Sequence, residues 1–179
     1  MKEKSNTHAF NGKKILLLGR KYETHFLEER ASTFNEIHSL YALKEDLPLD
    51  TRPYVTRLAA FHKHERRELL QDHDLLFENY PKYVAVLTWE SIDHAKATIP
   101  RRVLTSSLAC LLYSIIIEED LTSLSLTLHG FPLGSDTEYF HQREAVSYLL
   151  GYLESAGTRI HGYELLYENE GVYGRELVL

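Results

Sequence analysis

Short apolar runs in the first half of the chain alternate with stretches of helical spacing. Residues 13–20 contain a continuous aliphatic run, which predicts a strand buried on both faces. Residues 24–43 fit either one helical face or a second strand. In residues 54–77 the apolar positions recur at threes and fours, which predicts a helix, and residues 83–89 are β-branched and aromatic, as in a strand.

The second half continues this alternation. Pro100 is tolerated in a first helical turn and opens a helix that is predicted to run to about residue 117. Residues 124–128 alternate apolar and small polar side chains, which is a strand pattern. Residues 160–167 and 176–179 predict two further strands.

Capping signals bound a second helix in this half, over residues 135–156. Ser135 and Glu138 match a capping box, and Gly157 predicts a left-handed C-terminal cap. The order of elements predicts a single α/β domain over residues 13–179, with three α/β/α layers and a mixed, mostly parallel sheet. Residues 1–12 are polar, and we expect a flexible N-terminus there.

Composition is that of a globular chain. Its 179 residues are 44% hydrophobic and 26% charged, which suits one compact domain. The net charge of −6 disfavours nonspecific nucleic-acid binding, no apolar run of about 18 residues occurs, and we expect no signal peptide. The single cysteine, Cys110, lies in an apolar run and predicts a buried, inert thiol. We expect a cytoplasmic protein without a cofactor, a membrane or a nucleic-acid partner.

Ten histidines are the unusual count, and protonating all of them would take the formal charge from −6 to +4. The densest group could supply metal ligands: His62, His64, Asp72, His73 and Asp74. On one regular helix, however, His62 and His64 point 200° apart, and His62 and His73 lie about 16 Å apart. The sequence therefore favours a solvated, charged helix face over a metal site.

Motifs for nucleophilic or nucleotide chemistry do not occur. Ser106 and Ser107 lie within the helix predicted for residues 100–117, and the chain has no Gly-x-Ser-x-Gly elbow, Walker loop or Gly-x-Gly-x-x-Gly. No catalytic residue is assigned on this basis, and the balance is against an enzyme.

The most informative loop joins the strand at 124–128 to the capped helix. Its candidate ligand-binding residues are His129, Gly130, Phe131, Gly134, Ser135 and Asp136. Glycines let a backbone approach a ligand, and helix N-terminal amides bind anions. The alternative is an ordinary strand-to-helix connection whose amides Ser135 caps, with Asp136 disfavouring an anion.

This loop belongs to a unit of recognisable order. Residues 123–167 comprise a strand, the loop Gly-Phe-Pro-Leu-Gly, a helix containing Glu-Ala-Val-Ser-Tyr-Leu-Leu, and a strand. The unit resembles the last strand-loop-helix-strand unit of macro-like domains, which include macrodomains and the N-terminal domain of leucine aminopeptidases. A similar unit precedes caspase-like protease domains in some bacterial proteins. The resemblance implies a macro-like fold, although Phe131 and Pro132 stand where the family's ligand loop is rich in glycine.

Three functions follow, in order of preference. The first is a non-enzymatic binding or regulatory module that acts through protein partners, in a bacterial multi-protein system of the defence type. The second is a protein that binds or hydrolyses ADP-ribose or another nucleotide derivative at residues 129–136. The third is a metal-dependent phosphohydrolase that uses His62, His64 and His73.

Tyrosines gather in the C-terminal third and favour a partner or self-association surface there. They are Tyr139, Tyr148, Tyr152, Tyr163, Tyr167 and Tyr173.

Overall fold

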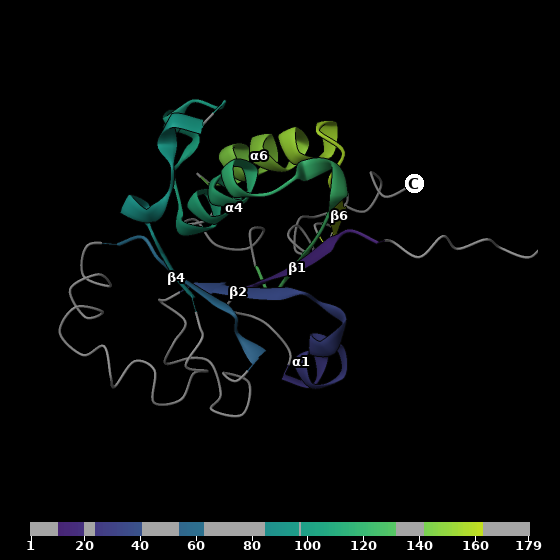
Figure 1. Ribbon diagram of the computed structural model, residues 1–179. Coiled ribbons are helices and arrows are strands. Elements are labelled where there is room, and N and C mark those ends of the chain that lie inside the picture. The colour runs from purple at the N-terminus through teal and green to yellow at the C-terminus, as the bar shows by residue number, and fades with distance from the viewer. Residues whose placement is uncertain are drawn as a thin grey trace, which may run out of the picture.

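One parallel sheet organises the described part of the chain (Figure 1). The computed structural model describes residues 11–19, 24–40, 54–62, 85–96, 98–131 and 142–162. The strands are β1 (Lys13–Leu18), β2 (Glu36–Leu40), β3 (Arg57–Ala60), β4 (Ala85–Thr88), β5 (Leu124–His129) and β6 (Arg159–His161).

The strands lie in the order β4-β3-β2-β1-β5-β6, and each neighbouring pair is parallel. The sequence-based expectation of a mixed sheet is therefore wrong for these six strands. Because the strands are parallel, the chain must return to the amino edge of the sheet before each new strand begins. A long helix makes this return between β4 and β5, and another makes it between β5 and β6.

The helices are α1 (Thr24–Arg30), α4 (Ser107–Glu118) and α6 (Arg143–Ser155). Figure 1 shows α4 and α6 side by side over one face of the sheet, with α1 on the other side. None of the helices in the described part of the chain is long and apolar enough to span a membrane.

Side chains of β1 alternate between the two faces. Ile15 and Leu17 pack in the core cluster that contains α4 and α6, whereas Leu16 and Leu18 pack with Leu27 of α1. All four β1 side chains are 0% exposed. Residues 13–18 thus form the strand buried on both faces that their unbroken aliphatic run predicts.

The helix predicted for residues 54–77 is wrong over residues 57–60, which form β3. Leu58 and Ala60 face the α1 side of the sheet, and Ala59 faces the α4 side. A four-residue strand buried on both faces shows no apolar-polar alternation, so its residues can match a helical period by chance. Residues 24–43, whose spacing fits either a helix or a strand, contain both: the helix α1 comes first and the strand β2 follows.

The helix expected from Pro100 begins later. Residues Arg101–Val103 form a 3-10 turn, and α4 starts at Ser107. Ser106 is its N-cap, with a side chain that accepts a hydrogen bond from the Ala109 N–H at 3.1 Å. The capping hydroxyl satisfies an amide that has no intrahelical acceptor, and this sets the start of the helix.

The end of α6 follows the prediction, but its start does not, because α6 begins at Arg143 after the N-cap Gln142 and not at residue 135. Gly157 has φ 102, its N–H donates to the Glu154 carbonyl, and the Thr158 N–H donates to the Leu153 carbonyl. This pair of bonds is a Schellman cap, which requires a left-handed residue such as glycine. The capping box at Ser135 and Glu138 lies outside the described residues, as do residues 1–10 and the strand expected at 176–179.

Candidate functional site at the carboxyl edge of the sheet

The strand order reverses direction between β1 and β5. From β1 the chain continues through β2, β3 and β4 toward one edge, and β5 and β6 then build out the other. The connections that leave neighbouring β1 and β5 therefore diverge at their carboxyl ends. In open parallel sheets such a switch point is where ligands bind, because the diverging connections leave a crevice.

Gly19 and Gly130 bring the backbones into contact at this point. The Gly19 N–H donates to the His129 carbonyl at 2.7 Å. A Cβ on Gly19 would overlap the Gly130 carbonyl oxygen and lie 2.7 Å from the Cγ of Phe131. Gly130 has φ 78, in the left-handed region that glycine adopts without strain.

Aromatic rings flank the same strand ends. The ring of His129 stacks on that of Phe26 from α1, with centroids 3.9 Å apart and planes 10° from parallel. The Arg30 guanidinium lies 6.0 Å from the centroid of the Phe26 ring. His129 is half-buried and Phe131 is buried. Three of the predicted loop residues thus lie at the switch point, while Gly134, Ser135 and Asp136 lie outside the described residues.

His62, the first of the predicted metal ligands, lies just beyond β3 on the same edge of the sheet. Its Nε2 is 3.0 Å from the Oγ of Ser107, the first residue of α4. His64, Asp72, His73 and Asp74 fall outside the described residues. Within the described ranges, no three His, Cys, Asp or Glu side chains come together as a metal site.

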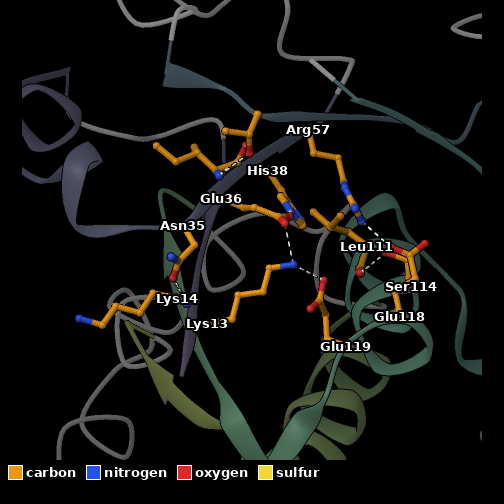
Figure 2. A network of polar contacts seen from close by, with 12 residues as sticks. Lys13, Lys14, Asn35, Glu36, His38, Arg57, Leu111, Ser114, Glu118 and Glu119 are labelled. Atoms are coloured by element: carbon orange, nitrogen blue, oxygen red, sulfur yellow. Dashed lines mark hydrogen bonds and ion pairs between the residues drawn. The ribbon is translucent and has the colours of Figure 1, made fainter. Parts of the chain in front are cut away.

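A charged network that the sequence analysis missed lies at the opposite, amino edge of the sheet (Figure 2). Lys13 Nζ is 2.6 Å from Glu36 Oε1 and 2.7 Å from Glu119 Oε1, so it joins β1 and β2 to the residue that follows α4. Arg57, the first residue of β3, pairs with Glu118 at the end of α4. The signal was present, because Lys13, Glu36 and Arg57 each open a strand and parallel strands align their first residues at one edge.

His38 lies within this network and is fully buried. Its Nε2 is 2.6 Å from Glu36 Oε2, whereas its Nδ1 has no hydrogen-bond partner among the described residues. Burial lowers the pKa of His38, against the opposing effect of Glu36. The hydrogen bond from His38 in turn helps lower the pKa of Glu36 to about 2. The ring is therefore neutral, with Nε2–H donating to the carboxylate.

Lys13 and Cys110 are two half-buried groups whose pKa values are also shifted. Burial acts to lower the pKa of Lys13, but hydrogen bonds to Glu119 and Glu36 outweigh it and raise that pKa above its usual value. Burial raises the pKa of the Cys110 thiol to about 11. Because reactivity requires the thiolate, the raised pKa disfavours reaction of Cys110 at neutral pH, although its side chain is half-buried and not fully buried as the sequence predicts.

Comparison of the chain with protein-family models, with curated proteins and with solved structures gives no match. The function is therefore argued from the fold and from these residues.

Proposed function

We propose that the protein binds a small nucleotide-derived ligand at the carboxyl ends of β1 and β5. The observation that carries the proposal is the strand order β4-β3-β2-β1-β5-β6, whose switch point falls between these two strands. The connections that leave the carboxyl ends of β1 and β5 run to opposite sides of the sheet. This divergence favours a crevice that can hold a ligand over continuous packing of side chains.

The residues at the switch point suit the close approach of a ligand. Gly130 has φ 78 and carries no side chain, so that a polar ligand group can approach the backbone of its turn, whereas the space beside Gly19 is filled by the Gly130 carbonyl and Phe131. The His129 ring lies beside this turn, stacked on Phe26. These features favour a nucleotide or ADP-ribose over an apolar ligand.

We also propose that the fold has three layers and is macro-like. Core clusters lie on both faces of the sheet, which supports an α/β/α arrangement of three layers. The macro-like resemblance of residues 123–167 points to the same loop, since that family binds ADP-ribose after the corresponding strand. The proposal does not depend on the resemblance, because the switch point follows from the strand order.

A titration monitored by amide NMR tests the proposal. ADP-ribose, AMP and inorganic phosphate are added separately to ¹⁵N-labelled protein, up to millimolar concentration. We expect saturable shifts of the Gly19, His129 and Gly130 amides with ADP-ribose and AMP, and a His129→Ala variant that binds at least fivefold more weakly. A Tyr148→Ala variant, with its substitution on the exposed face of α6, serves as the control and should bind normally. Absence of shifts, or shifts confined to other residues, would contradict the proposal.

The partner-directed function has one specific observation in its favour. Tyr148 on α6 is 48% exposed, and tyrosine is favoured at interfaces because it has an apolar ring and a polar hydroxyl. Tyr152 lies one turn away, and its hydroxyl is 2.7 Å from that of Thr98. Light scattering of the wild type and of Tyr148→Ala at two concentrations tests self-association through this face. An identical monomer mass for both proteins at both concentrations would remove this second candidate.

A further inference from the structure

A serine hydroxyl and a histidine ring meet at the amino terminus of α4. Ser107 Oγ lies 3.0 Å from His62 Nε2, although the two residues are 45 positions apart in sequence. In the tautomer with the proton on Nδ1, His62 Nε2 accepts the hydrogen bond from the Ser107 hydroxyl. A hydroxyl within hydrogen-bond reach of an imidazole nitrogen is the arrangement that activates a serine nucleophile.

We infer that Ser107 is a nucleophile, that His62 is its general base, and that the pair acts on carboxylic esters. This activity goes beyond ligand binding at the switch point and uses different residues. The two places share the carboxyl edge of the sheet, where β2 alone separates β3 from β1. Catalytic residues of open parallel sheets gather at this edge.

The start of α4 supplies the second requirement of acyl transfer, which is stabilisation of an oxyanion. The first intrahelical hydrogen bond runs from the Cys110 N–H to the Ser106 carbonyl, and the Ala109 N–H is capped by Ser106 Oγ. The amides of Ser107 and Leu108 precede these bonds and have no intrahelical acceptor. In many serine hydrolases the N–H after the nucleophile binds the oxyanion, which here is that of Leu108. The positive end of the twelve-residue helix favours the same charge.

Exposure of the pair allows a substrate to reach it. His62 is exposed and Ser107 is half-buried. Sequence reasoning missed the pair because it placed Ser107 inside a helix that began at Pro100. An interior serine would hydrogen-bond to a preceding carbonyl, whereas the first residue of a helix projects its side chain beyond the helix end.

The step balances without a further cofactor. Ser107 Oγ attacks the ester carbonyl carbon while its proton passes to His62 Nε2. The attack forms the O–C bond of a tetrahedral intermediate. Collapse of the tetrahedral intermediate breaks the ester C–O bond, and the alcohol leaves with the proton that His62 donates. Water then attacks the acyl-serine while His62 Nε2 takes its proton. As the acyl C–O bond breaks, that proton passes from His62 to Ser107 Oγ, and the carboxylic acid is released.

The first experiment measures covalent labelling by a fluorophosphonate probe, with peptide mapping by mass spectrometry. We expect one adduct, on Ser107, and none in Ser107→Ala. His62→Ala should be labelled about 100-fold more slowly or worse, and added imidazole should restore part of the rate. Ser155→Ala and His161→Ala are matched controls at exposed positions and should be labelled like the wild type.

A thiol substitution provides a measurement that does not depend on the probe. In Ser107→Cys, we expect iodoacetamide at pH 7 to alkylate position 107 at least tenfold faster than Cys110, whose burial keeps its thiol protonated. Adding His62→Ala should remove most of that advantage. Circular dichroism checks that each variant is folded. Labelling on another serine, no labelling at all, or unchanged labelling in His62→Ala would overturn the inference.

Discussion

The carbonyl oxygen of Gly130 occupies the space in which a side chain on Gly19 would begin. The two glycines end neighbouring parallel strands that are far apart in sequence, and the Gly19 N–H is bonded to the carbonyl next to Gly130. The contact fixes how β1 and β5 diverge and thereby shapes the proposed ligand site. It also makes Gly19 a position where the fold depends on the absence of a single methyl group.

Gly19→Ala should lower the free energy of unfolding by about 2 kcal/mol or more, because a Cβ there meets backbone atoms that cannot move independently of the sheet. Gly151→Ala is the matched control. It lies in α6 with open space around it and should stabilise the protein by about 0.5–1 kcal/mol through helix propensity. Urea denaturation of the three proteins measures both effects. Equal stability of Gly19→Ala and the wild type would show that the contact is not close in solution.

Stability should fall in acid because of His38 and Glu36. Burial lowers the native pKa of His38 below its usual 6.5, so the unfolded chain binds more protons as pH falls below about 6.5, and stability is lost there. The native pKa of Glu36 is about 2 against a usual 4.5, so a second loss occurs as pH falls from about 4.5 toward 2. Lys13, Arg57 and Glu36 are the charged groups that act on His38, and the first two lower its pKa further.

The measurement is the free energy of unfolding in urea between pH 4 and 8. His38→Gln keeps a donor for Glu36 but cannot titrate, so its stability should change less than that of the wild type between pH 6.5 and 5. His161→Gln, at an exposed position on β6, should follow the wild-type curve. A wild-type curve that is flat between pH 6.5 and 5 would contradict a buried neutral His38.

Lys13→Met should destabilise the protein by about 1–2 kcal/mol, because it keeps the apolar stem but leaves Glu36 and Glu119 without their shared cation. Adding Glu119→Gln should recover part of the loss, since one of the unpaired charges is then gone. Lys96→Met is the control, because its ion pair with Asp93 is largely exposed and should contribute less than about 0.5 kcal/mol. Denaturation curves that coincide for the two lysine variants would refute a structural role for the network.

Tyr113→Phe should leave stability unchanged or raise it by up to about 1 kcal/mol. The ring is fully buried in α4 against Trp89 and His94, and the hydroxyl has no hydrogen-bond partner among the described residues. Removing a buried hydroxyl without a partner ends a desolvation cost. Tyr152→Phe provides the contrast, because its hydroxyl bonds to Thr98 and its loss should cost up to about 1 kcal/mol. A thermal unfolding midpoint that drops for Tyr113→Phe would reveal a partner for this hydroxyl.

The sequence by itself determined those elements whose signals are local. The aliphatic run of β1, the alternation of β5 and the glycine that ends α6 each act through neighbouring residues, so their periodicity and caps are readable from the chain. The inert environment of Cys110 followed in the same way from its apolar neighbours.

Only the tertiary structure decided which strand lies beside which. Strand order, the wholly parallel pairing and the switch point depend on contacts between residues that are not neighbours in sequence, and those between β1 and β5 join residues more than 100 positions apart. The short strand β3 becomes a strand because β2 and β4 hold it on both sides, against the helical spacing of its own residues. The pairing of His62 with Ser107 and the burial of His38 beside Glu36 arise in the same way. Local patterns specify a side chain's face and period, whereas its partners are fixed only when the sheet and helices close around it.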